Sequence, residues 1–184
     1  MPMYLKYTLW ALVSLAFNFV VWLLAPVVAI PAAVFNLSSL PVPLSWFYTH
    51  DTDIYGSATT QEPIPGTVWG RYKRAVWWMY RNPGYGFDAY VLGYPADGSI
   101  VNVITSHGTF GSNDGAILHA SIVYPSGLRL FSYRRDVRLT KTKYLKVWFG
   151  WHYVNQAGRR MLKIDITPKS AEIAPSERTE HALP

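Results

Sequence analysis

The first third of the chain is an almost unbroken run of apolar residues. Leu9–Leu24 has the length of a helix and is followed by Ala25-Pro26 and a second apolar stretch, Val27–Leu44. A transmembrane helix needs about 20 predominantly apolar residues. The pattern therefore predicts that residues 1–44 form a hydrophobic membrane segment.

Three arrangements of this segment are compatible with the pattern. A cleaved signal peptide is disfavoured because the apolar region is too long and no small-residue cleavage site precedes a polar sequence. A single span would run from Leu9 to about Val34, with a kink at Pro26. A hairpin would turn at Ala25-Pro26 and bring the aromatic residues at both ends of the segment to one membrane interface. We favour the hairpin, with the remainder of the chain on the cytoplasmic side.

A connector and an amphipathic helix are predicted to follow the membrane segment. Residues 45–65 are rich in Pro, Thr, Ser and Gly, which is typical of a connector. Thr67–Arg81 has helical periodicity and ends before Asn82-Pro83-Gly84. On a helical wheel its apolar face consists of Trp69, Tyr72, Ala75, Val76, Met79 and Tyr80.

The other face of this helix is basic, and two further tryptophans lie at the boundary between the faces. This composition is typical of a helix in a membrane interface. The alternative is that the apolar face packs on the rest of the domain while the arginines face water. Together with the aromatic cluster before the connector, the expected interface residues are Trp46, Phe47, Tyr48, Trp69, Arg71, Arg74, Trp77, Trp78 and Arg81.

Beyond Gly84 the hydrophobic periodicity changes to two. Six segments alternate like half-buried strands and are separated by turn residues: Phe87–Leu92, Ile100–Thr105, Ala116–Tyr124, Leu128–Tyr133, Tyr144–Val154 and Arg160–Ile166. With the preceding helix they predict a mainly β (α+β) domain over residues 66–167, an antiparallel meander of about six strands. Residues 168–184 are predicted to be disordered.

Charge is concentrated after the membrane segment. After His50 the chain carries 16 of its 17 basic and all 11 acidic residues, a formal charge of +5. This positive charge favours an anionic partner. Because the membrane segment brings the domain close to lipid headgroups, lipid is the favoured partner, and nucleic acid is possible but not favoured. A basic, aromatic run from Tyr133 to Trp148 has the composition to bind either partner, although the simplest interpretation is a pair of strands whose basic side chains face water. The absence of cysteine excludes disulfides and thiolate metal sites.

One loop has the spacing of a calcium site. Asp51, Asp53 and Glu62 occupy positions one, three and twelve of the calcium-loop pattern. Gly56 stands at position six, but Tyr55 replaces the usual Asp or Asn at position five. Prolines on both sides argue against the flanking helices of an EF-hand. The alternatives are a connector stabilised by Ca²⁺ and a solvated acidic turn.

No constellation for catalysis is evident. The five histidines have no metal-ligand spacing, and the chain has neither a G-x-S-x-G motif nor a phosphate-binding glycine loop. The Gly-rich loop from His107 to Gly115 is where a site between strands would lie, although most such loops are only connections. The sequence therefore predicts a protein that is not an enzyme and has no organic cofactor.

Five motifs resemble those of a known family. They are L-L-A-P at Leu23–Pro26, W-F-x-T-x-D at Trp46–Asp51, R-N-P-x-Y-G-F-D at Arg81–Asp88, L-K-V-x-x-G-W at Leu145–Trp151 and T-P at Thr167-Pro168. In these motifs the chain resembles an uncharacterised family of small membrane-associated proteins of tailed bacteriophages and prophages. The most distinctive residues are Arg81, Asn82, Pro83, Tyr85, Gly86, Phe87 and Asp88.

The resemblance implies a phage origin and a bacterial host membrane. Tyr55 stands where the family tends to carry a second acid, which weakens a shared metal role. We expect a non-enzymatic phage protein that binds lipid and an unidentified host or phage protein at the host inner membrane. Two alternatives remain open: a virion component that contacts membrane or DNA during genome entry, and an envelope-modifying enzyme that uses Asp51, Asp53 or the His107 loop.

Overall fold

The computed structural model describes residues 2–111, 115–140, 142–155 and 157–170. The chain forms two compact units. We call Thr8–Tyr94 the helical unit, and Met1–Tyr7 together with Pro95–Pro184 the sheet unit. Most of the tail that the sequence predicts to be disordered, residues 171–184, lies outside the described residues, and residues 168–170 belong to the last strand.

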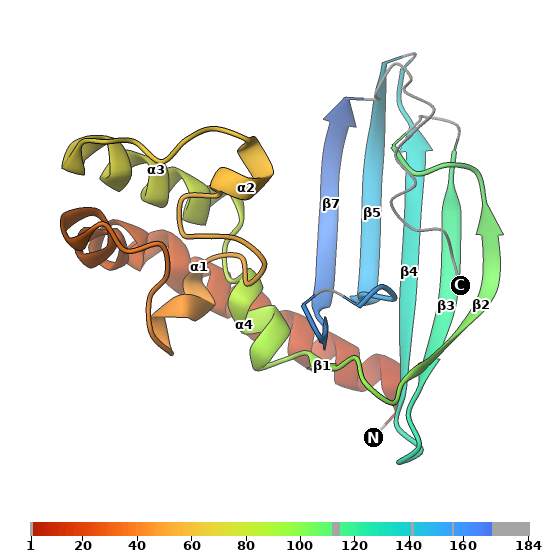
Figure 1. Ribbon diagram of the computed structural model, residues 1–184. Coiled ribbons are helices and arrows are strands. Elements are labelled where there is room, and N and C mark those ends of the chain that lie inside the picture. The colour runs from red at the N-terminus through yellow and green to blue at the C-terminus, as the bar shows by residue number, and fades with distance from the viewer. Residues whose placement is uncertain (1, 112–114, 141, 156, 171–184) are drawn as a thin grey trace. The chain divides into compact units, whose positions relative to one another are not determined.

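The apolar N-terminal segment is one continuous helix, α1 (Met3–Phe35), with Pro26 inside it (Figure 1). The turn predicted at Ala25-Pro26 is therefore wrong. A proline removes one helical hydrogen bond but does not reverse the chain, which needs residues outside the helical region. The first such residue is Asn36, at φ 53°, and the Leu37 amide then closes the helix on the Ala32 carbonyl (3.0 Å).

Four short helices complete the helical unit: η1 (Leu44–Phe47), α2 (Ser57–Thr60), α3 (Val68–Arg81) and α4 (Tyr85–Tyr90). The predicted amphipathic helix is confirmed as α3, and its predicted first residue, Thr67, caps it by accepting a hydrogen bond from the Gly70 amide (3.1 Å). Figure 1 shows α3 alongside α1. It packs there within the helical unit, on the small side chains of α1.

The predicted strand Phe87–Leu92 is wrong, because these residues fall in and just after helix α4. Alternation over five or six residues does not distinguish a short helix from a strand. Here Gly84, at φ 67°, starts a new helical turn directly after α3. Phe87 then stacks on Phe17 of α1, with ring centroids 4.1 Å apart.

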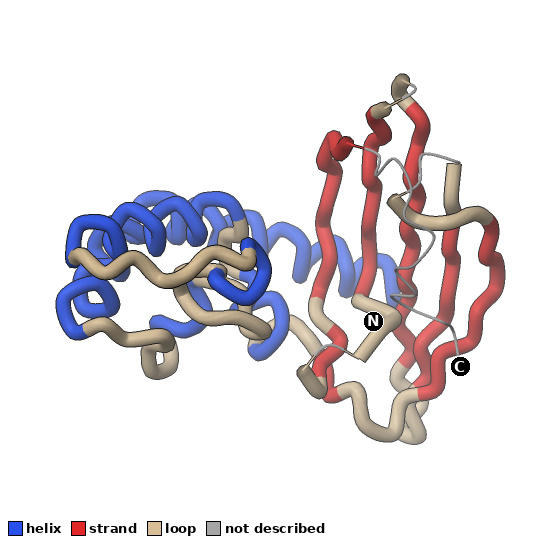
Figure 2. Tube along the Cα trace, turned by 45° about the horizontal axis from the view of Figure 1, so that its top comes forward, coloured by secondary structure: helices blue, strands red, loops and turns tan. Residues whose placement is uncertain are grey.

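The sheet unit contains a five-stranded antiparallel sheet, seen in Figures 1 and 2, with the order β2-β3-β4-β5-β7. Its strands are β2 (Ile100–His107), β3 (Ile117–Val123), β4 (Arg129–Arg138), β5 (Lys143–Trp151) and β7 (Leu162–Ser170). A short pairing joins β1 (Tyr94–Pro95) and β6 (Arg159–Arg160). The α+β class and the antiparallel meander are thus confirmed, because period-two alternation is specific for strands of this length.

The two faces of this sheet are packed differently. On one face, Leu118 and Ala120 of β3 form a small core with Trp148 and Tyr153. On the other face, Phe131 and Trp151 meet the start of α1, where the Tyr7 hydroxyl donates to the Lys163 carbonyl (3.0 Å). The first turn of α1 therefore belongs to the core of the sheet unit.

Candidate functional site

Helix α1 has two faces that differ in side-chain size. The buried face consists mainly of small residues: Ser14, Val21, Ala25, Val28, Ala29, Ala32 and Ala33. The opposite face, called the outer face below, consists of large apolar side chains that remain exposed: Leu9, Leu12, Val13, Leu15, Phe19, Val20, Trp22, Leu23, Leu24, Val27, Ile30 and Val34. Small side chains allow a second helix to approach closely, whereas the outer face is left without a comparable cover among the described residues.

The carboxyl end of α1 is closed by side chains from two later segments. Arg71 donates from Nε to the Ala33 carbonyl (2.8 Å) and from Nη1 to the Gly66 carbonyl (2.9 Å). The Tyr55 hydroxyl donates to the Ala32 carbonyl (2.8 Å), and burial raises its pKa, although the Arg71 guanidinium opposes this rise. Because the last turn of α1 has no basic residue of its own, Arg71 supplies the positive charge that a helix C-terminus favours.

Helix α3 presents a different face to the unit's interior from the one that its sequence predicts. Its buried residues are Arg71, Ala75, Trp78 and Met79. This stripe is rotated by about a quarter of a turn from the predicted apolar face, at about 100° per residue. Part of the predicted face is therefore exposed or only half-buried. We call this part the α3 flank; it consists of Trp69, Tyr72, Val76 and Tyr80.

Basic residues run beside the α3 flank. The Lys73 ammonium lies 5.7 Å from the centre of the Trp69 ring, and the Arg81 guanidinium lies 5.2 Å from that of Trp77. Helix α3 contains no acidic residue. We call Lys73, Trp77 and Arg81 the basic edge. Aromatic rings beside cations, next to an apolar surface, are typical of side chains at the headgroup level of a membrane.

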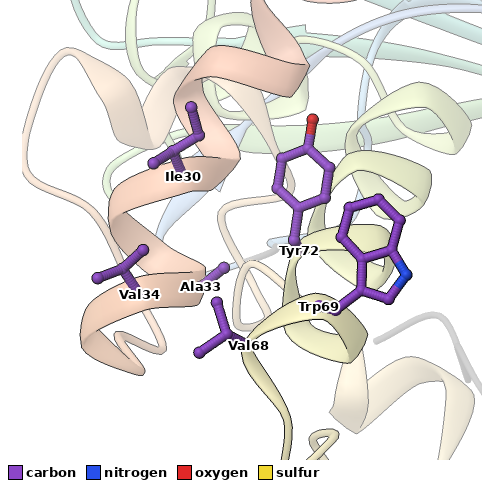
Figure 3. Close-up of a pocket in the computed structure, with 6 residues that line it drawn as sticks. All are labelled: Ile30, Ala33, Val34, Val68, Trp69 and Tyr72. Carbon is purple, nitrogen blue, oxygen red and sulfur yellow. The ribbon is translucent and has the colours of Figure 1, made fainter.

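An apolar groove of about 520 Å³ lies between the end of α1 and the start of α3 (Figure 3). Its lining residues are Ile30, Ala33, Val34, Val68, Trp69 and Tyr72. Ile30 and Val34 belong to the outer face of α1, whereas Trp69 and Tyr72 belong to the α3 flank. The groove therefore joins these two regions into one apolar surface.

The predicted interface residues fall into two groups. One group is exposed or half-buried and consists of Trp46, Trp69, Arg74, Trp77 and Arg81. The other is buried inside the helical unit and consists of Phe47, Tyr48, Arg71 and Trp78. In the buried group, the Tyr48 hydroxyl accepts from the Leu40 amide (2.9 Å), and burial raises its pKa. The buried side chains hold the unit together and are not available to lipid.

The distinctive R-N-P-x-Y-G-F-D motif builds the junction between α3 and α4. The Asn82 amide closes α3 on the Trp78 carbonyl (3.0 Å), and Pro83 follows where the helix ends. An added Cβ on Gly86 would lie 2.5 Å from the Ser45 carbonyl oxygen, so only glycine fits against η1. The remaining motif residues are the exposed Arg81, the half-buried Tyr85 and Phe87, and the buried Asp88. The contacts of the motif are therefore mainly structural.

The acidic loop does not gather its three carboxylates. The Asp53 carboxylate accepts from two backbone amides of the turn that follows it (2.8 and 3.1 Å), whereas Glu62 pairs with Arg74 of α3 and Asp51 is exposed. Within the described ranges, no three His, Asp or Glu side chains come together as a metal site. A Ca²⁺ site here stays a prediction, and the observed contacts are those of a turn tied to α3.

A buried charged cluster lies on the Trp148 face of the sheet. Arg134, Lys146 and Lys163 surround the Trp148 ring, with their charged groups 5.0, 5.2 and 5.3 Å from its centre. The Lys146 ammonium lies 2.6 Å from the Asp165 carboxylate. Two members of the predicted basic run, Arg134 and Lys146, are thus turned inward and are mostly covered. They stabilise the sheet and leave a smaller basic surface for a ligand.

The His107 loop contacts the same face of the sheet. Its Gly111 amide donates to the buried Asp136 carboxylate (2.9 Å), and Phe110 lies 4.0 Å from the Arg134 guanidinium. His107 itself is exposed at the end of β2. Asp114 of the same loop lies outside the described residues. The described contacts of the loop cover the face of the sheet, as a connection does.

Residues 1–173 match a family model described as Family of unknown function (DUF7338). The chain belongs to this family. The match confirms the predicted membership of an uncharacterised family and includes both the helical unit and all strands of the sheet. No curated protein and no solved structure matches the chain. The phage origin of this DUF7338 member stays a prediction.

Three features of this DUF7338 chain were not predicted from its sequence. The small and large faces of α1 could have been found, because Ser14, Val21, Ala25, Ala29 and Ala32 recur at helical spacing. The capping role of Arg71 has no local signal, because the α1 carbonyl that it caps, that of Ala33, lies 38 residues earlier in the chain. The buried charges of β7 have none either, because alternation marks a lysine or aspartate as solvent-facing.

Proposed function

We propose that this chain is a non-enzymatic, membrane-attached protein that uses the outer face of α1 and the α3 flank to bind lipid. The observation that carries the proposal is the exposure of large apolar side chains along α1; Leu23 and Val27 are 62% and 61% exposed. Exposed apolar surfaces of this extent mark membrane or protein interaction sites. Helix α1 is also long and apolar enough to cross a membrane.

The membrane in this proposal is the inner membrane of a bacterial host, with the sheet unit on its cytoplasmic side, and the chain is of phage origin. The family resemblance through the R-N-P-x-Y-G-F-D motif supports the origin. The formal charge of +5 after His50 supports a leaflet rich in anionic lipid. Lys6, at the start of the apolar run, is consistent with a cytoplasmic N-terminus.

The proposed protein partner binds at the β2 edge of the sheet. Strand β2 is an edge strand, and its residues Ile100, Val103 and Ile104 are exposed. An exposed edge strand offers free backbone hydrogen-bonding groups to a strand from another chain. Site-directed photocrosslinking from Ile104 in infected cells should yield a discrete adduct. The absence of an adduct, with an intact protein, would remove the partner from the proposal.

Membrane attachment is tested by changing the outer face and following the chain through membrane fractionation with an alkaline carbonate wash. One triple variant replaces three outer-face residues by Gln: Leu12, Leu23 and Val27. The matched control replaces three exposed apolar residues that lie outside α1, α3 and β2 (53–70% exposed): Val42, Leu139 and Ile166. We expect the outer-face variant to leave the membrane fraction and the control to remain with it. Equal retention of both variants would refute attachment through α1.

A further inference from the structure

The part of α1 that is free of protein contacts is short. The 33-residue helix is about 50 Å long. Within the sheet unit, Tyr4 and Tyr7 pack on aromatic side chains of the sheet. Within the helical unit, ring and hydrogen-bond contacts extend from Phe17, which stacks on Phe87, to Ala33, whose carbonyl accepts from α3. Protein therefore packs on α1 near its start and along its second half.

Between these contacts lie at most the eight residues from Leu9 to Ala16. Eight residues of helix extend about 12 Å, whereas a bilayer crossing needs about 20 residues. Ser14, within this stretch, is itself buried. Any crossing by α1 would therefore draw part of the protein packed around it into the hydrocarbon.

The protein packed on the second half of α1 does not suit hydrocarbon. The segment from Asn36 to Thr67 contains only two four-residue helices, and the rest of its backbone is irregular. Irregular backbone exposed to lipid leaves its amide and carbonyl groups unsatisfied. In addition, Asp51, Lys73 and Arg81 are exposed, and charges are costly at membrane depth. These features place the helical unit at the membrane surface.

We propose that α1 lies in the plane of the membrane, with its outer face and the α3 flank immersed in one leaflet of anionic phospholipid. This inference rests on the proposed membrane attachment and specifies its geometry. The two regions share the apolar groove lined by Ile30, Val34, Trp69 and Tyr72, so they can meet the same leaflet. The groove, seen in Figure 3, lies where an acyl chain of that leaflet can enter between the helices.

Charge complementarity identifies the leaflet as anionic. The basic edge runs along α3 beside the apolar flank, and Lys73 and Arg81 each lie over a tryptophan ring. Tryptophan and lysine at the rim of an apolar surface bind at the level of the phosphate groups. Helix α3 carries no acidic side chain that would repel these phosphates. The surface thus has the layered chemistry of an interfacial helix.

The absence of cysteine permits a labelling test on the full chain. A double variant, Pro2→Cys with Gly66→Cys, places one thiol near the start of α1 and one before α3; a Cβ at Gly66 meets no atom within 4 Å. The variant is reconstituted in vesicles of phosphatidylcholine and phosphatidylglycerol and treated with a membrane-impermeant maleimide. In-plane binding predicts that each molecule acquires either two labels or none, whatever its orientation. One label per molecule, seen by intact mass, would show a crossing helix and overturn the inference.

Depth measurements separate in-plane binding from a crossing helix and from failed attachment. Single cysteines carrying a nitroxide are placed along the outer face at Leu12, Phe19, Leu23 and Ile30, with Thr59 as the exposed control. In-plane binding predicts a similar depth of about 5–10 Å at all four positions and a water-accessible control. A maximum near the middle of the series, approaching about 15 Å, would overturn it. If all five labels were water-accessible, membrane attachment itself would fail.

Discussion

Replacement of Arg71 by Met should destabilise the helical unit, because Arg71 closes the carboxyl end of α1. Arg71 is only 9% exposed, and its guanidinium joins the end of α1 to the start of α3. Met keeps a long apolar side chain in the same space but has no donor. The Ala33 carbonyl, which is buried, would lose its partner, whereas the exposed Gly66 could turn its carbonyl to water.

The expected loss follows from these contacts. A hydrogen bond from a charged donor contributes about 1.5–3 kcal/mol, and the bond to the buried Ala33 carbonyl should lie near the upper end. A cation at a helix C-terminus contributes about 0.3–1 kcal/mol more. The sum, about 3.5 kcal/mol, corresponds to an increase on the order of 300-fold in the opening constant of the helical unit. Arg71→Lys retains the charge and should show a smaller increase.

Hydrogen exchange in lipid nanodiscs measures this opening constant directly. The amides of Leu37 and Ile54 are the reporters, because both are bonded near the end of α1, to the carbonyls of Ala32 and Ser38. Arg138→Met, at an exposed position of the sheet unit, is the control and should change exchange at these amides by less than about threefold. If the Arg71 and Arg138 variants exchanged alike at the reporter amides, the capping role would be refuted.

Two further changes test the packing of each unit. Gly86→Ala should lower the melting temperature of the helical unit, because the new Cβ would lie 2.5 Å from the Ser45 carbonyl oxygen. Gly66→Ala is the control, since a Cβ there meets no atom within 4 Å. A melting temperature that neither substitution changes would contradict the close approach at Gly86. Burial raises the pKa of Asp165, but Lys146 and neighbouring hydrogen bonds outweigh this effect and lower it overall. Since its folded pKa lies below the unfolded value of about 3.9, the ionised pair stabilises the sheet unit above that pH, and this stability is lost as the pH falls through the folded pKa. Acid unfolding followed by tryptophan fluorescence should therefore depend less on pH in Asp165→Asn than in the parent, and parallel curves would contradict the pairing.

The periodicity of hydrophobic residues and the residues typical of turns and helix ends were sufficient to predict much of the fold. Five of the six predicted strands lie in the sheet, because each segment alternates with period two between turn residues, as strands do. Helix α3 was predicted to within one residue, since Thr67 caps it and Asn82-Pro83 ends it. These signals are local and require no knowledge of distant contacts.

The failures have a common cause, which is that the local signal was weak and a distant contact decided the outcome. Ala25-Pro26 permits either a kink or a turn, and the small-residue face of α1 that packs in the helical unit continues through it. The buried face of α3 differs from the predicted one because Arg71 is buried and donates to a distant carbonyl, whereas a helical wheel counts every arginine as polar surface. The site was affected in the same way, because the predicted tryptophans differ in burial: Trp69 and Trp77 are exposed, Trp46 is half-buried and Trp78 is buried.

The sequence by itself determined that the chain carries a charge-free apolar segment before a basic, antiparallel domain, because composition and periodicity are properties of the residues alone. Only the tertiary structure decided which apolar side chains are used up in packing. A side chain buried against α3 cannot also contact lipid, and that allocation depends on side-chain size and on hydrogen bonds between segments far apart in the chain. The outer face of α1, the α3 flank and the basic edge are what this allocation leaves at the surface.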